Sequence, residues 1–163
     1  MRVAVADTGP LHYLVLIEAV ELLPELFGRV LVPEIVCAEL DRPRTPASVR
    51  AWLARHPAWL EPRPTPPVAA LPLPGLGDGE RAAIALAQTV GAALVLMDDR
   101  AGVAAARTHG LTATGTLGVL ERAAARGLVD LPAAVARLKG TNFRYRVALL
   151  DALLARHRAG KAP

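Results

Sequence analysis

The stretch ALVLMDDR, residues 93–100, joins an apolar run directly to two adjacent carboxylates, Asp98 and Asp99. Short continuous apolar runs are typical of strands that are buried on both faces of a parallel sheet. Two like charges side by side repel each other, so their position immediately after such a strand requires an explanation. In open α/β sheets the functional crevice lies beyond the carboxyl ends of the strands, and this arrangement would place both acids there.

The rest of the chain alternates similar short apolar runs with helical patterns. Strands are predicted at residues 2–6, 29–33, 93–97 and 111–115, and helices at 11–26, 33–40, 46–56, 77–90, 101–109, 116–126, 132–139 and 144–158. Residues 57–74 hold seven of the 14 prolines and are predicted to be an irregular surface connection. The alternation predicts an α/β fold, a three-layer sandwich with a central, mostly parallel β-sheet, in one domain over residues 1–163.

Composition excludes several classes of protein. The chain is 53% hydrophobic, but no apolar run reaches the roughly 20 residues that span a bilayer, and no signal peptide is visible, so we expect a cytoplasmic protein without membrane contact. One cysteine, Cys37, cannot form an internal disulfide, and we expect it to be a small buried side chain.

The charge of the chain is unevenly distributed. Residues 1–80 contain 7 Lys and Arg against 10 Asp and Glu, whereas residues 81–163 contain 12 against 5. A basic half favours a polyanionic partner, although arginines that simply solvate helix surfaces explain the same count.

Three further acids occupy positions where a function is plausible. Asp7 ends the first predicted strand, although turn chemistry with the following residues also explains it. Glu39 follows Ile35 by four residues and therefore shares the apolar face of its helix. Glu80 lies in the first turn of its helix, where the helix dipole alone stabilises a carboxylate by about 0.3–1 kcal/mol.

Gathered in one crevice, these carboxylates would repel each other by several kcal/mol unless some were protonated or a divalent cation were bound. A site with only oxygen ligands suits Mg²⁺ or Mn²⁺. Two such ions can activate water and stabilise the leaving oxygen of a phosphodiester. The acids together therefore predict a site for Mg²⁺ or Mn²⁺, of a kind that can act on a phosphodiester.

Several motifs resemble those of a known family. They are VADTGPL at residues 5–11, VPEIVCAEL at 32–40, GERAAIALA at 79–87, LVLMDDRAGVAAA at 94–106, GTLGVLERAAARGLV at 115–129 and NFRYRVALLDALL at 142–154. In this order they resemble a PIN domain, and more narrowly the VapC-like branch of toxin ribonucleases. The resemblance covers nearly the whole chain.

The resemblance implies a site in which Asp7, Glu39, Glu80 and Asp98 or Asp99 are catalytic and bind Mg²⁺ or Mn²⁺. Glu80 stands where many PIN domains have Asp, and the Thr-x-Asp spacing of the family favours Asp99 over Asp98, with both retained as candidates. Thr8 and Thr116 would orient carboxylates or a water molecule. In this hypothesis water attacks the scissile phosphate in line and leaves 5′-phosphate and 3′-hydroxyl ends.

The implied function is cleavage of single-stranded RNA as the toxin of a type II toxin–antitoxin system, with a small antitoxin protein and a second copy of the chain as possible partners. The alternative is a catalytically weak PIN-type module that binds RNA or protein. An Asp-based phosphotransfer domain is disfavoured because the only lysines, Lys139 and Lys161, lie far from the acids in sequence.

Among the basic residues, Arg100 is the best candidate for binding RNA because it adjoins the acids, and Arg107, Arg122 and Arg126 are weaker candidates that solvation of helix faces explains equally. The two tryptophans, Trp52 and Trp59, are expected in the core or an interface. The four histidines show no metal-binding spacing and are expected to be peripheral.

Overall fold

A five-stranded sheet in which every neighbouring pair of strands is parallel forms the centre of the fold. The computed structural model describes residues 3–67 and 73–161. The strands are β1 (Ala4–Ala6), β2 (Val30–Pro33), β3 (Leu60–Arg63), β4 (Leu94–Leu96) and β5 (Thr112–Thr114), in the order β3-β2-β1-β4-β5. The helices are α1 (Thr8–Leu16), α2 (Leu22–Phe27), α3 (Glu34–Leu40), α4 (Ala47–Ala54), α5 (Asp78–Val90), α6 (Arg100–Thr108), α7 (Thr116–Ala125), α8 (Leu131–Lys139) and α9 (Val147–Lys161).

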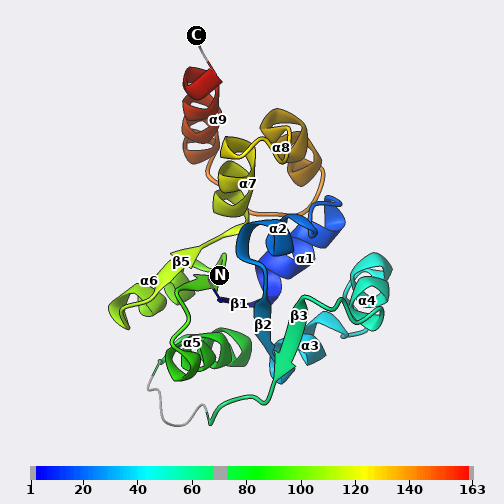
Figure 1. The fold of residues 1–163 in the computed structure, drawn as a ribbon, viewed down its shortest axis with the longest axis vertical. Coiled ribbons are helices and arrows are strands. Elements are labelled where there is room, and N and C mark those ends of the chain that lie inside the picture. The colour runs from blue at the N-terminus through cyan, green and yellow to red at the C-terminus, as the bar shows by residue number, and fades with distance from the viewer. Residues whose placement is uncertain (1–2, 68–72, 162–163) are drawn as a thin grey trace.

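Helices cover both faces of the sheet, so the predicted three-layer sandwich is confirmed (Figure 1). Side chains alternate between the two faces along each strand because a strand has a period of two. On β1, Val5 faces a core that includes residues of α5 and α6, whereas Ala4 and Ala6 face a larger core built with α1, α2, α4, α7 and α8. Every residue of β1, β2 and β4 is buried, which explains why these strands are continuously apolar in sequence.

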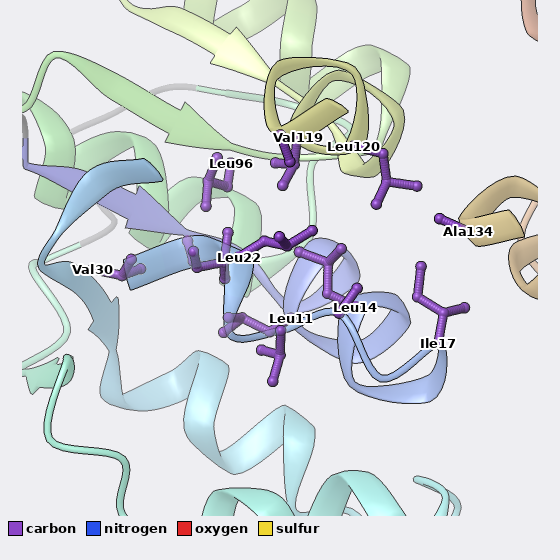
Figure 2. Packing of buried hydrophobic residues seen from close by; sticks show 14 of the residues in the cluster. Leu11, Leu14, Ile17, Leu22, Val30, Leu96, Val119, Leu120 and Ala134 are labelled. Carbon is purple, nitrogen blue, oxygen red and sulfur yellow. The ribbon is translucent and has the colours of Figure 1, made fainter. Parts of the chain in front are cut away.

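The larger core joins helices that are far apart in sequence. Figure 2 shows Leu11 and Leu14 of α1 beside Leu22 of α2, with Val119 and Leu120 of α7 packed nearby. Leu11, Leu14 and Leu120 are fully buried. Burying one such leucine contributes about 1.5–3 kcal/mol, so this contact holds α1, which follows β1, against α7, which follows β5.

The prediction of a single helix over residues 11–26 is wrong, because the structure has two helices there, α1 and α2. The helical run breaks after α1 because Glu18 adopts a left-handed conformation, with φ of 58°. The N–H of Ala19 then donates to the carbonyl of Leu14 at 2.8 Å, the pattern of a helix C-cap that usually contains glycine. Pro24, predicted near the end of one long helix, lies instead in the first turn of α2, where its missing N–H costs nothing.

The prediction that residues 57–74 lack regular structure is also wrong in part. Leu60–Arg63 forms β3, which pairs in parallel with β2 at the edge of the sheet. An edge strand tolerates Pro62 because one side of its backbone has no neighbouring strand to bond. Residues 68–72 of the predicted connection, and Arg2 of the predicted first strand, lie outside the described residues.

The other predicted helices and strands are present with ends shifted by a few residues. Trp52 is buried and its ring lies 5.9 Å from that of Trp59, so both tryptophans belong to the α4 side of the larger core. Cys37 is partly buried against the same core. Within residues 3–67 and 73–161, no helix combines the length and the apolar character that crossing a bilayer requires.

Candidate active site

The candidate site lies where the order of the strands reverses. The chain proceeds from β1 to β2 and β3 on one side of the sheet, and β4 then pairs with the other side of β1. Ala6 is in register with Leu96, and the N–H of Asp7 donates to the carbonyl of Leu96 at 2.9 Å. Asp7 and Asp98 therefore leave adjacent parallel strands at the same edge, which is the position where sheets of this type bind ligands.

Five carboxylates from four separate segments of the chain share one cavity at this edge. The cavity has a volume of about 190 Å³ and is lined by Asp7, Thr8, Gly9, Glu39, Gly77, Gly79, Glu80, Asp98 and Asp99. Asp7 follows β1, Glu39 lies on α3, Glu80 lies in the first turn of α5, and the aspartate pair joins β4 to α6. The structure thus brings together all five acids that the sequence singles out, and it brings Thr8 with them.

Glycines bring these segments close enough to share the cavity. A Cβ atom on Gly79 would lie 2.6 Å from Oε2 of Glu39, and one on Gly115 would lie 2.5 Å from Oδ1 of Asp98. Such distances are well inside ordinary van der Waals contact, so only glycine leaves room for the carboxylates at these two positions. Gly79 precedes Glu80 in the GERAAIALA motif, but nothing in the sequence indicates that this glycine makes room for Glu39, which is distant in the chain.

Asp7 is the most buried acid of the site, with 6% of its surface exposed. Burial raises the pKa of Asp7 from 3.8 to about 7, the N–H of Thr8 opposes this increase, and the charges of Glu80, Glu39 and Asp98 add to it. A carboxyl group in this state is half protonated near neutral pH, and a nearby cation would favour the ionised form.

Glu39 and Glu80 are held by donors within the protein. The hydroxyl of Thr8 donates to Oε2 of Glu39, which links the start of α1 to α3. The N–H of Gly77 donates to Oε2 of Glu80 at 2.6 Å, so Glu80 does cap its own helix as the simpler explanation expects. Burial raises the pKa of Glu80, and the charges of Asp99 and Glu39 raise it further against the effect of Gly77.

The two adjacent aspartates have different environments. Asp98 accepts the N–H of Thr116 at 2.6 Å and the hydroxyl of Thr116 at 2.7 Å, and burial nevertheless raises the pKa of Asp98. Asp99 is exposed and accepts the N–H of Gly102 at 2.9 Å, so it is the N-cap of α6. The fully buried Thr116 therefore orients Asp98, and both aspartates line the cavity.

The chemistry of these side chains fits a hard divalent cation. The charged groups that line the cavity are all carboxylates, and the other side chain with a hydrogen-bonding atom there is the hydroxyl of Thr8. Among residues 3–67 and 73–161, no three His, Cys, Asp or Glu side chains stand already arranged as one ligand set. Glu39, Glu80, Asp98 and Asp99 each accept a hydrogen bond from the protein. Mg²⁺ usually keeps several waters and needs only one or two carboxylates, so this arrangement suits it.

The predicted basic residues lie outside the cavity. Arg100, Arg107, Arg122 and Arg126 are all exposed, and none of them lines it. Arg126 donates to the carbonyl of Glu25, and with Arg122 it borders a separate pocket beside α2. Arg100 begins α6 directly after the aspartate pair, so it remains close to the site in sequence.

Comparison with known families agrees with this geometry. The profile of a family described as a PIN domain matches residues 3–159, which is nearly the whole chain. No curated protein matches the sequence. The matched range includes every acid of the cavity, Thr8 and Thr116, and most of the terminal helix α9.

Proposed function

From the premise that the chain belongs to the PIN-domain family, whose members are generally nucleases, we propose that it is a Mg²⁺- or Mn²⁺-dependent endoribonuclease that cleaves single-stranded RNA. The observation that carries this proposal is the single cavity in which Asp7, Glu39, Glu80, Asp98 and Asp99 meet at the carboxyl ends of β1 and β4. Five acids in so small a volume favour a bound cation, and a phosphodiester is the substrate that such a site serves best.

In the proposed mechanism the acids divide into two groups. Asp7, Glu39 and the aspartate pair would hold the cation, and Glu80 would help to orient the attacking water or a second ion. A bound cation supplies positive charge that offsets the charge developing on the phosphate oxygens. Thr8 and Thr116 hold the carboxylates of Glu39 and Asp98 in fixed positions, so little reorganisation is needed when substrate binds.

A biological role follows from the same resemblance. We propose that the protein is the toxin of a type II toxin–antitoxin system, neutralised by a small antitoxin protein and active as a homodimer. The DTGPL, GE, DD and GTLGVL motifs support this role. Growth arrest on expression of the wild type, relieved by Asp7→Asn, would support it, whereas normal growth would contradict it.

Cleavage of single-stranded RNA by the purified protein tests the enzymatic proposal. Wild-type protein should cleave in Mn²⁺ and stop when EDTA is added, and Asp7→Asn should be inactive while keeping its circular dichroism spectrum. Asp151→Asn is the matched control because Asp151 is an exposed acid on α9, away from the cavity. Equal cleavage by wild type and Asp7→Asn would refute the assignment, and failure of the wild type to cleave would favour a binding module.

A further inference from the structure

The connection between α8 and α9 is attached to α1 by an aromatic cluster. The hydroxyl of Tyr13 donates to Oδ1 of Asn142 at 3.0 Å. The ring of Tyr13 meets that of Phe143 edge to face, with centroids 5.0 Å apart and an interplanar angle of 78°. Such a pair contributes about 0.5–1.5 kcal/mol beyond its buried area. Figure 1 shows this connection passing α1 on its way to α9.

Tyr13 lies on the side of α1 that faces the acidic cavity. Gly9 is one turn earlier on the same face, and a Cβ atom on Gly9 would lie 3.1 Å from Oδ2 of Asp98. Side chains on a helix lean toward its N-terminus, so the ring of Tyr13 extends over the turn that contains Gly9, toward Asp98. The loop that Tyr13 holds is therefore positioned beside the site, although it is more than forty residues later in the chain than the aspartate pair.

The electrostatics of Tyr13 agree with this placement. Burial raises the pKa of the Tyr13 phenol, the charge of Asp98 raises it further, and the charge of Arg144 lowers it. Both charged groups must lie near the phenol to affect it. Tyr13 therefore lies near both an acid of the cavity and a cation of the loop.

The guanidinium of Arg144 forms no ion pair with any of the described residues. Its side chain is exposed. If Arg144 served to neutralise the acids, it would form an ion pair with one of their carboxylates, and no such pair is found among the described residues. An exposed arginine whose segment contacts Tyr13 on α1 suits a phosphate group, which a guanidinium binds with two parallel hydrogen bonds.

We propose that Arg144 binds a backbone phosphate of the nucleic acid beside the one that is cleaved, and that Tyr13 is a positioning residue that holds the Asn142–Arg144 segment for this contact. This inference rests on the proposed nuclease function. It assigns the cationic part of the substrate site to a segment other than Arg100, the residue that the sequence favours. Tyr145 and Arg146, which follow Arg144 in sequence, are also exposed.

The test is equilibrium binding of a fluorescein-labelled single-stranded RNA of mixed sequence, measured by anisotropy over a range of KCl concentrations. Ca²⁺ replaces Mg²⁺ so that binding is measured without turnover, and a gel verifies that the probe stays intact. Arg144→Ala should weaken binding about tenfold. It should also reduce the slope of log K against log salt by about 0.7, the value for one phosphate contact on a single strand.

Three variants separate this contact from a general effect of charge or fold. Arg158→Ala removes the same charge from an exposed position on α9 and should leave affinity and slope unchanged. Arg144→Lys should restore the slope but only part of the affinity, because lysine keeps the charge without the bidentate geometry. Tyr13→Phe removes the hydrogen bond to Asn142 but keeps the ring, and should weaken binding less than Arg144→Ala does.

The outcomes distinguish this inference from the proposed function. If the wild type binds and cleaves RNA, and Arg144→Ala matches Arg158→Ala in affinity and slope, the Arg144 assignment is wrong while the nuclease proposal stands. If the wild type neither binds nor cleaves RNA, both are wrong. A tenfold loss confined to Arg144→Ala, with cleavage showing a raised KM and a kcat close to that of the wild type, supports the inference.

Discussion

Replacing Asp7 with Asn should stabilise the metal-free protein at alkaline pH. The pKa of Asp7 is raised by burial from 3.8 to about 7, and a difference of this size corresponds to about 4 kcal/mol. Asn has nearly the same shape as Asp, so the variant loses the charge with little change in packing. The figure of about 4 kcal/mol is an upper bound, because solvent and neighbouring side chains relax around an ionised group.

The sign follows from the proton count of each state. The folded protein holds the proton of Asp7 up to about pH 7, whereas the unfolded chain releases it near pH 3.8, so Asp7 lowers the free energy of unfolding as pH rises between these values. Relative to wild type, Asp7→Asn should therefore gain stability from about pH 4 upward and reach its full gain above about pH 7. For a chain of this size each kcal/mol shifts Tm by about 2–4 °C.

Thermal unfolding monitored by circular dichroism in EDTA, at about one pH unit above and two below the pKa of about 7, measures this effect. Asp151→Asn is the control, because it makes the same substitution at an exposed acid on α9, outside the cavity. Addition of Mn²⁺ should raise the Tm of the wild type and leave that of Asp7→Asn nearly unchanged. The reasoning would be refuted if Asp7→Asn lowered Tm equally at both pH values.

Three other substitutions test individual contacts. Gly79→Ala should displace Glu39 and greatly reduce Mn²⁺-dependent cleavage, because the added methyl group would lie 2.6 Å from Oε2 of Glu39. Tm should change little, since the methyl group meets only the end of a flexible side chain. Unchanged cleavage would show that cleavage does not require Glu39 in its present position. Thr116→Val removes the hydroxyl that donates to Asp98, so it should lower the free energy of unfolding in urea by about 1 kcal/mol. It should also raise the pKa of Asp98 further, because the lost hydrogen bond lowers that pKa. An unaltered pKa in an NMR titration would count against the contact. Glu18→Gly should raise the free energy of unfolding by about 0.5–1 kcal/mol, because residue 18 has a φ of 58°, which glycine adopts without strain. A lower free energy of unfolding would argue against the break between α1 and α2.

The sequence predicted the central sheet well because its strands are buried on both faces. In a chain with alternating helical patterns, the short continuous apolar runs of β1, β2 and β4 indicate interior strands of a parallel sheet. The strand β3 was missed because an edge strand has fewer backbone partners and therefore tolerates proline, which interior strands exclude. The break in the helix predicted over residues 11–26 was missed because Glu18, a residue that rarely adopts positive φ, occupies the position where glycine usually marks a helix end.

The acids of the cavity were predictable for a similar reason. Residues that follow parallel strands meet at one edge of the sheet, so Asp7 and the aspartate pair could be brought together from sequence alone. The difference between Asp98 and Asp99 could not be predicted, because it depends on the hydrogen bonds from Thr116, which is distant in sequence. The proposed role of Arg144 could not be predicted for the same reason, since it depends on the contact between Tyr13 and Phe143, which are distant in sequence.

Isothermal titration of Mn²⁺ into the purified protein tests the central claim most directly. The claim is that the cavity formed by Asp7, Glu39, Glu80, Asp98 and Asp99 binds a divalent cation. At about pH 7 the wild type should bind Mn²⁺ and release part of a proton, detected as a heat that depends on the buffer, because binding ionises Asp7. Asp7→Asn should bind much more weakly without proton release. Absence of binding by the wild type, or equal binding by Asp7→Asn, would contradict the account.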